Sequence, residues 1–315
     1  NLSEYFSITF EKHSKMRYGE NPHQSAASYK VPGNNEPNIL NAEIHQGKQL
    51  SYNNIMDADG ALACLREFDK PACVVVKHSN PCGVAVGNDL LDVYLRAFNA
   101  DSLSAFGGII ALNRMCTNDI AEEINKVFVE IVLAPCFEPG ALEVFKKKKN
   151  LRILEIGEFG KRIPKLEVRN IDGGILVQDV DTKSLTQKDL TVVTGKQPSG
   201  EDIETALFSW KVLRHAKSNG ILIAKNNTTV GLGAGQVSRV DAVHMALRKG
   251  SENVKGGILA SDAFFPFRDS IDAISSSGIR AVIQPGGSIR DQEVIDACNE
   301  YNIAMLFTGQ RCFKH

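Results

Sequence analysis

The chain has 315 residues, of which 43% are hydrophobic and 23% charged, and its 36 basic and 37 acidic side chains give a formal net charge of −1. This composition is typical of a folded globular protein, and it excludes a disordered chain or a broadly basic binder of nucleic acid. No apolar run reaches the ~18–20 residues of a membrane-spanning helix, and the first residues lack the pattern of a signal peptide. The seven scattered cysteines form no C-x-x-C pair, so we expect a reduced, soluble, cytoplasmic protein with no nucleic-acid or membrane partner.

Apolar β-branched runs alternate with amphipathic stretches in the first half, which indicates a sheet covered by helices. The apolar runs predict strands at 73–76, 108–112, 130–134 and 151–156. The stretches with helical spacing predict helices at 90–98, 119–127 and 139–148. Residues 179–199 are polar and turn-rich, and they are the best candidate for a join between two halves.

The second half repeats this scheme. It predicts helices at 202–215, 240–248, 269–276 and 291–301, and strands at 221–225, 257–260, 281–284 and 304–307. The apolar runs are continuous rather than alternating, which favours a parallel or mixed sheet covered on both faces. A faint internal echo, Lys77-His78-Ser79-Asn80 after one strand and Lys217-Ser218-Asn219 before another, fits either a duplicated fold or chance.

The most informative heptad is Lys77–Gly83 (KHSNPCG), directly after a predicted strand. Pro81 and Gly83 predict a loop of fixed shape. An ammonium beside an imidazole offers an electrophilic stabiliser and a proton acceptor within one site. The structural alternative is a surface Lys-His pair at the end of a strand.

Other clusters also have two interpretations each. Arg17–Gln24 (RYGENPHQ) offers a guanidinium for phosphate and a ring for stacking, or is an N-terminal turn. Ser261–Asp269 (SDAFFPFRD) suits a flat ring with carboxylates to accept its N–H groups, or forms a plug under a helix start. Residues 231–236 form a glycine-rich loop that is neither a dinucleotide fingerprint nor a P-loop. Gly286-Gly287-Ser288 offers N–H groups to an anion, or forms a turn and an N-cap.

Metal chemistry is not predicted. Pro81-Cys82 begins the P-C-x-x-C motif of zinc deaminases, but Ala85 stands where the second cysteine belongs. No histidine is followed by x-Glu, no H-E-x-x-H occurs, and no G-x-S-x-G elbow marks a serine nucleophile.

Seven motifs occur in an order that resembles the AICAR transformylase part of the bifunctional enzymes of purine biosynthesis, over nearly the entire chain. They are 17–24 (RYGENPHQ), 47–54 (GKQLSYNN), 77–83 (KHSNPCG), 105–108 (AFGG), 233–239 (GAGQVSR), 261–269 (SDAFFPFRD) and 284–291 (QPGGSIRD). The resemblance implies an α/β fold of two tandem cytidine-deaminase-like α/β/α three-layer subdomains, with mixed sheets and no zinc, which we place at 1–190 and 191–315. It also implies an intertwined homodimer with active sites at the subunit interface. A structural monovalent cation stays open.

The activity that the resemblance implies is transfer of a formyl group from 10-formyltetrahydrofolate to the 5-amino group of AICAR, which gives FAICAR and tetrahydrofolate. By motif, Lys77, His78 and Asn219 match the family's catalytic residues: His78 as base, Lys77 as oxyanion stabiliser and Asn219 as the group that orients the intermediate. Which basic group protonates the leaving nitrogen stays open. Substrate-binding positions are implied for Arg17, Tyr18, Phe106, Gly107, Glu130, Lys149, Ser238, Arg239, Phe264, Asp269, Arg311, Phe313 and His315, with Arg17, Arg311 and Lys149 on the phosphate.

One departure from the family concerns its N-terminal IMP cyclohydrolase domain, to which no part of this sequence corresponds. We therefore expect ring closure to need a separate IMP cyclohydrolase. A natural stand-alone enzyme and an excised half both fit the sequence. Two other hypotheses remain, a zinc nucleobase deaminase and a non-catalytic nucleotide-binding protein that has kept the pocket.

Overall fold

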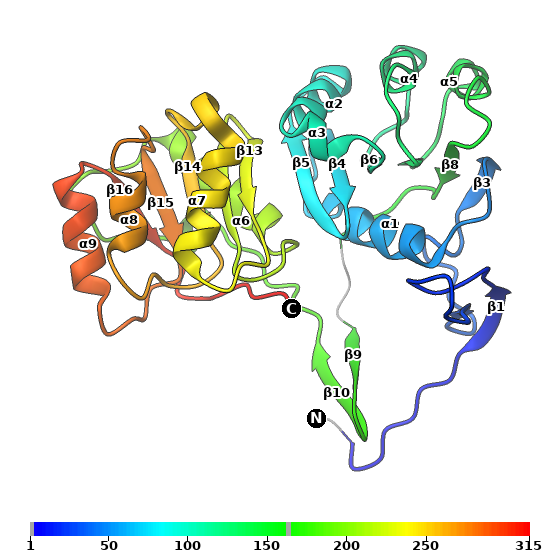
Figure 1. The fold of residues 1–315 in the computed structure, drawn as a ribbon, viewed down its shortest axis with the longest axis horizontal. Coiled ribbons are helices and arrows are strands. Elements are labelled where there is room, and N and C mark those ends of the chain that lie inside the picture. Colours follow the sequence, from blue (N-terminus) through cyan, green and yellow to red (C-terminus); the bar gives the residue numbers. More distant parts are fainter. Residues whose placement is uncertain (1–2, 162–164) are drawn as a thin grey trace.

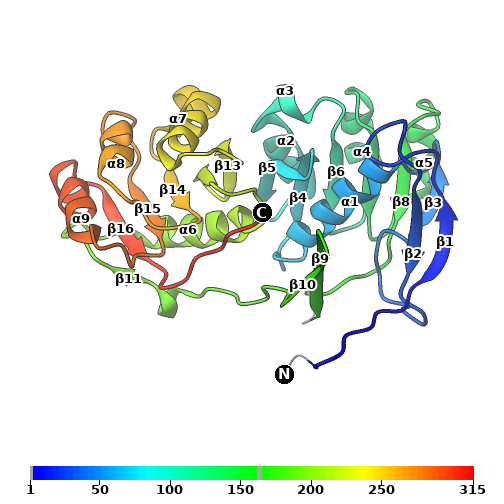
Figure 2. The same ribbon diagram turned by 60° about the horizontal axis from the view of Figure 1, so that its bottom comes forward.

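The computed structural model describes residues 3–161 and 165–315. In these residues one sheet of twelve strands runs through the molecule in the order β11-β16-β15-β14-β12-β13-β5-β4-β6-β7-β8-β3, with helices on both faces (Figures 1 and 2). The mixed sheet confirms the predicted α/β class. The subdomain type and the boundaries at 190 and 191 stay predictions.

Among the described residues, the first half supplies six strands of the large sheet and five helices. The strands are β3 (Glu43–Gln46), β4 (Ala72–Lys77), β5 (Asn80–Val86), β6 (Ile109–Leu112), β7 (Ile131–Ala134) and β8 (Arg152–Glu155). The helices are α1 (Tyr52–Leu65), α2 (Leu90–Asn99), α3 (Ser102–Ala105), α4 (Asn118–Asn125) and α5 (Pro139–Phe145). Two hairpins stand outside the large sheet, namely β1 (Glu11–Lys15) with β2 (Ala27–Lys30), and β9 (Leu166–Ile171) with β10 (Gly174–Asp179).

The second half supplies the rest of the large sheet. Its strands are β11 (Thr191–Val192), β12 (Ile221–Lys225), β13 (Thr228–Gly233), β14 (Ile258–Ser261), β15 (Ala281–Gln284) and β16 (Ala304–Phe307). Its helices are α6 (Gly200–Leu213), α7 (Arg239–Gly250), α8 (Asp269–Ile274) and α9 (Asp291–Glu300), with short 3₁₀ turns at Gln187–Asp189 and Ser251–Val254.

The two halves share one topology. In each, a long helix leads into an antiparallel hairpin, β4-β5 or β12-β13, and three parallel strands follow on the other side of its first strand. Helices α1 and α6 both have 14 residues and both begin at a serine with a capping box, Ser51 with Asn54 and Ser199 with Asp202. The halves join where β5 meets β13 in antiparallel pairing, at Ala85 and Thr228.

This duplication is not the one suggested by the short sequence echo. Lys77 ends β4, and the residue that ends the matching strand β12 is Lys225. Lys217 instead precedes β12, so the two echoed segments lie at opposite ends of equivalent strands.

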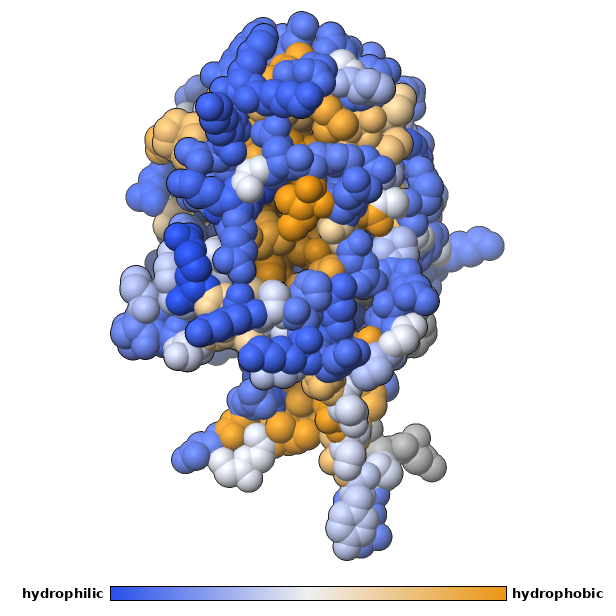
Figure 3. Space-filling model, turned by 90° about the vertical axis from the view of Figure 1, so that its right-hand side faces the viewer, coloured by the Kyte–Doolittle hydropathy of each residue, from blue (hydrophilic) through white to orange (hydrophobic). Residues whose placement is uncertain are grey.

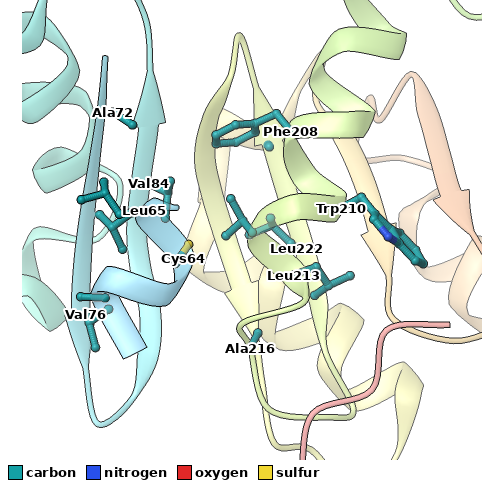
Figure 4. Close-up of a cluster of buried hydrophobic side chains, with 14 of the residues drawn as sticks. Cys64, Leu65, Ala72, Val76, Val84, Phe208, Trp210, Leu213, Ala216 and Leu222 are labelled. Atoms are coloured by element: carbon teal, nitrogen blue, oxygen red, sulfur yellow. The ribbon is translucent and has the colours of Figure 1, made fainter. Parts of the chain in front are cut away.

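Apolar side chains fill both faces of the sheet, as the continuous apolar runs predicted. One core lies under α1 and α6 and crosses from one half to the other (Figure 4). Two further cores lie on the opposite face, one under α2, α4 and α5 and one under α7, α8 and α9. No helix of the described chain is long and apolar enough to cross a membrane.

Two predicted loops prove to be parts of strands. The heptad Lys77–Gly83 is a hairpin, in which His78 and Ser79 form a two-residue turn and Asn80 already begins β5. The glycines at 231 and 233 lie inside β13 rather than in a loop. A Cβ on Gly233 would lie 2.0 Å from the carbonyl oxygen of Ala242, so glycine is required there because α7 packs directly on the strand.

Candidate functional site

The predicted site residues lie at one edge of the sheet because of how the halves are joined. The pairs β4-β5, β5-β13 and β13-β12 are all antiparallel, so the end of β4 and the beginning of β12 lie at the same edge. Lys77 ends β4, and Asn219 lies just before β12. Three strand spacings separate the two strands, about 14 Å in all. The connecting segments touch, since the Lys217 N–H donates to Asn80 Oδ1 at 3.2 Å.

The first cluster at this edge surrounds the tip of the β4-β5 hairpin. Lys77 Nζ donates to the carbonyl oxygen of Phe106. A Cβ on Gly107 would lie 3.6 Å from this Nζ, so the glycine is a direct neighbour of the ammonium. His78 is exposed at the tip of the turn, and Asp57 of α1 accepts from its N–H at 3.2 Å.

The second cluster lines a cavity of about 730 Å³ in the second half. Phe264 and Phe267 are exposed on its wall, whereas Phe265 is buried in the core beneath. Phe265 therefore forms the predicted plug, whereas ligand binding by Phe264 and Phe267 stays a prediction. Seven of the predicted residues line this cavity: Asn219, Ser238, Arg239, Phe264, Asp269, Arg311 and Phe313.

A buried ion pair fixes one wall of the cavity. Arg239 Nη1 donates to Asp262 Oδ1 at 2.6 Å and to Ser261 Oγ at 2.8 Å, and Asp262 is fully buried. Arg239 Nη2 donates to Asn219 Oδ1 at 2.7 Å. The Asp262 carboxylate is thus occupied by hydrogen bonds within the protein. Asp269 is the carboxylate of the motif that lines the cavity.

The amide of Asn219 has little hydrogen-bonding capacity left. Its Nδ2 donates to the carbonyl oxygens of Gln236 and Val237, both at 3.0 Å. Its Oδ1 accepts from Arg239, and an amide oxygen can accept a second hydrogen bond. In this conformation Asn219 can therefore accept a hydrogen bond from a ligand but has no N–H to donate.

The third cluster lies at the beginning of β7 and β8. Glu130 accepts from Asn54 Nδ2 at 2.8 Å and lies 3.6 Å from Arg152 Nη1. Burial lowers the pKa of Arg152, although the charge of Glu130 supports the guanidinium. Arg17 and Tyr18 are near enough to Arg152 to act on its charge, and the Arg17 guanidinium lies 5.5 Å from the Tyr18 ring centroid.

Sequence reasoning missed Arg152 and Asp57. An arginine at the start of the apolar run 151–156 was the available signal for the first. Nothing marked Asp57, because the helix that carries it was not predicted.

The predicted residues are thus brought to one edge but not into one cavity. Lys77, His78, Phe106 and Gly107 form the first cluster, and Arg17, Tyr18 and Glu130 belong to the third. None of them, nor the exposed Lys149, lines the 730 Å³ cavity.

The chain end is fixed beside Asn219 rather than frayed. The Cys312 N–H donates to the Asp262 carbonyl at 3.0 Å, and the Ser218 N–H donates to the Lys314 carbonyl at 2.9 Å. The His315 ring lies 5.5 Å from that of Phe313, and its carbonyl oxygen accepts from Arg169 of β9.

The Pro81-Cys82 pair is poorly suited to zinc. Ala85, where the motif needs a second cysteine, offers no sulfur, and burial raises the pKa of the Cys82 thiol to about 12. Within residues 3–161 and 165–315, the group with metal-ligand spacing is Glu43, His45 and Glu155, on β3 and β8. His45 Nε2 lies 2.9 Å from Glu155 Oε2, so these side chains are paired with one another.

Comparison with known proteins agrees with the motifs. The family model described as AICARFT/IMPCHase bienzyme matches residues 1–249. Two curated proteins named "Bifunctional purine biosynthesis protein PurH" are similar to the chain. The protein of Acetivibrio thermocellus is 53% identical, and the match covers 98% of this chain and 60% of the relative. The protein of Caldicellulosiruptor saccharolyticus is 50% identical, and the match covers 99% of this chain and 61% of the relative. The chain therefore spans about three fifths of the length of these relatives. Among solved structures, Acinetobacter baumannii RibD, form 2, covers 32% of each chain at 16% identity with a TM-score of 0.24, too low to infer a shared fold.

Proposed function

Because this chain belongs to the AICARFT/IMPCHase bienzyme family, we propose that it is a formyltransferase that acts on AICAR. The formyl group comes from the co-substrate 10-formyltetrahydrofolate, and the products are FAICAR and tetrahydrofolate, in de novo purine biosynthesis. The observation that carries the proposal is the match to two bifunctional purine-biosynthesis proteins over 98% and 99% of this chain.

We assign the chemistry to the β4-β5 hairpin and to Asn219. The 5-amino nitrogen of AICAR is a weak nucleophile, so a base must take its proton as it attacks the formyl carbon, and exposed His78 fits that role. The Lys77 ammonium stabilises the oxyanion of the tetrahedral intermediate. The bond from the formyl carbon to N10 then breaks, and N10 leaves with a proton. Asn219 Oδ1 accepts an N–H of the nucleotide, since its own N–H groups are engaged.

The aromatic cavity suits a flat heterocycle. Its volume of about 730 Å³ is in the usual range for small-molecule sites. Phe264, Phe267 and Phe313 provide ring faces, and Asp269 can accept N–H groups of a ligand. The strands that carry Lys77 and precede Asn219 are about 14 Å apart, which leaves space for substrate between them.

We propose that the active site is shared between two copies. Arg17 follows β1 in the first half, whereas Arg311 lines the cavity in the second half. Both guanidiniums fit a phosphate, yet one chain keeps them in separate clusters. A second copy that brings its Arg17 to the cavity would complete the phosphate site, and Lys149 is a further candidate there.

Exposed apolar surface supports a homodimer. The β9-β10 hairpin has no other strand partner among the described residues, and a lone hairpin is only marginally stable. Five of its apolar side chains are exposed, among them Leu166 and Leu176, as are Tyr5, Phe6, Ile8 and Phe10 of the N-terminal segment. Figure 3 shows apolar atoms on this projecting part and in the middle of the face above it. Exposed apolar surface on this scale marks an interaction site.

The dimer has a direct test. Light scattering should give a mass of about twice the 34.4 kDa of one chain. Leu166→Ser with Leu176→Ser should lower that mass toward one chain, because it removes apolar contacts between copies. A wild-type protein that stays monomeric at micromolar concentration would contradict the proposal.

The activity is tested by incubating the protein with AICAR and 10-formyltetrahydrofolate. Mass spectrometry should detect FAICAR, and the absorbance of tetrahydrofolate should rise with it. AICAR binding by a folded dimer without turnover would favour a non-catalytic binding protein. Formation of IMP by the same protein would contradict the expectation that ring closure needs a separate cyclohydrolase.

A further inference from the structure

Asp57 clamps the turn that carries the two basic residues. Its Oδ1 accepts from the Ser79 N–H at 2.8 Å and from Ser79 Oγ at 3.0 Å, and its Oδ2 accepts from the His78 N–H at 3.2 Å. Asp57 stands on α1, a 14-residue helix fixed by the capping box at Ser51 and packed against the core of the sheet. The carboxylate therefore ties the tip of the hairpin to a rigid element.

The turn needs such support because both of its residues have a left-handed backbone. His78 has a φ of 50° and Ser79 a φ of 60°. A two-residue hairpin turn with positive φ at both positions favours asparagine and glycine, and a serine there carries a conformational cost.

The second half contains the matching turn without this clamp. Asn226 and Asn227 connect β12 to β13 with φ values of 51° and 53°, so the backbone is nearly the same and the residues suit it. Helices α1 and α6 correspond with an offset of 148 positions (200 − 52 = 148 and 213 − 65 = 148), which puts Thr205 at the place of Asp57. There Glu204 accepts from the Asn227 side chain at 3.0 Å.

We propose that Asp57 is a positioning residue for formyl transfer. It holds His78 and Ser79 in a left-handed turn that their residue types do not favour, so that the imidazole and the Lys77 ammonium keep one fixed arrangement. This inference rests on the proposed function of the hairpin. Within the described residues, the hydrogen bonds of the Asp57 carboxylate all come from the turn. Loss of this carboxylate should therefore lower the rate of the chemical step more than it weakens substrate binding.

The test compares three variants with the wild-type enzyme. Asp57→Ala should lower kcat about 10²-fold, the scale of a misplacement of about 1 Å, with a much smaller change in KM for AICAR. Ser79→Gly, placed in the Asp57→Ala background, should recover at least about tenfold in kcat, because glycine adopts positive φ without cost. Asp59→Asn removes the same charge from an exposed position of the same helix and should leave kcat unchanged.

Hydrogen exchange gives a readout that does not depend on turnover. The Ser79 amide should exchange faster in Asp57→Ala than in Asp59→Asn, because only the first variant loses its acceptor. A folded Asp57→Ala enzyme whose kcat stays within twofold of wild type would overturn the role, as would a failure of Ser79→Gly to recover activity. No turnover by the folded wild-type protein would overturn the proposed function itself, and this role with it.

Discussion

Arg239 is the residue on which the cavity wall depends. It is buried, and it donates both to the fully buried Asp262 and to Asn219. An ion pair of this kind is costly to break, because the buried Asp262 carboxylate would lose its charged partner and keep neutral donors such as the Gly220 N–H.

Arg239→Ala should therefore lower the free energy of unfolding by about 3–5 kcal/mol, measured by chemical denaturation. The matched control is Arg268→Ala, which breaks solvent-exposed pairs with Asp272 and Glu300 and should cost much less. Equal losses in the two variants would show that the buried pair is not the stabilising feature described here.

At the scale of single residues the motifs identified most side chains at the site edge, but not their partners. Lys77, Arg239 and Phe264 were visible because they stand in dense, recognisable clusters. Asp57 and Arg152 act through contacts with segments that are distant in sequence. The hydrogen-bond partners of Asp57 are 21 and 22 residues away from it. No local sequence pattern encodes such contacts.

Glycines in strand β13 allow helix α7 to pack closely against the strand. A Cβ on Gly233 would lie 2.0 Å from the Ala242 carbonyl oxygen, and one on Gly231 would lie 2.1 Å from that of Ala246. Both contacts are to backbone, so neither can be relieved by moving a side chain.

Gly233→Ala should thus destabilise the protein by about 1–3 kcal/mol, the usual cost of overpacking, with a fall in thermal midpoint. Gly160→Ala is the control, since a Cβ there would meet no atom of the described residues within 4 Å. An unchanged midpoint for Gly233→Ala would mean that α7 can move away from the strand freely.

The elements that the sequence predicted well are those with an unbroken apolar run. The strands at 221–225, 281–284 and 304–307 match β12, β15 and β16 at both ends. By contrast, β5 and β13 contain Pro81 and several glycines, which are typical of turns, and helix packing over the strand explains them only once the fold is known.

At the scale of the whole molecule, the half-buried Glu67 and the buried His215 meet at the seam between the two halves. Glu67, just after α1, lies 3.2 Å from His215 Nε2, just after α6. Burial lowers the pKa of His215, whereas the hydrogen bond and the charge of Glu67 raise it. The effect of burial is the larger one, so the pKa is lowered. For Glu67, burial raises the pKa, but His215 and Arg214 together outweigh burial and lower it.

This seam predicts a pH dependence of stability. Below pH ~6.5 the unfolded chain binds a proton on His215 more readily than the folded chain does. The contribution of His215 to the free energy of unfolding is therefore complete above that pH and is lost as the pH falls. The free energy of unfolding should decline between pH 7.5 and 5.5, with a slope from this group of at most about 1.4 kcal/mol per pH unit. Glu67 does not add to the slope in this window, because its lowered pKa lies below it.

His215→Gln removes the titrating group and keeps a donor toward Glu67, so its unfolding free energy should depend less on pH. Denaturation of both proteins across the same pH series checks this difference. Identical pH profiles would contradict the assignment to His215.

We propose that this chain transfers a formyl group with Lys77 and His78 as its reacting side chains. The most direct measurement is kcat with AICAR and 10-formyltetrahydrofolate, for the wild type and for the Lys77→Ala, His78→Ala double variant. We predict turnover by the wild type and a loss of at least about 10²-fold in the folded double variant, the scale of general acid–base and oxyanion groups. Wild-type activity in the double variant would contradict the account.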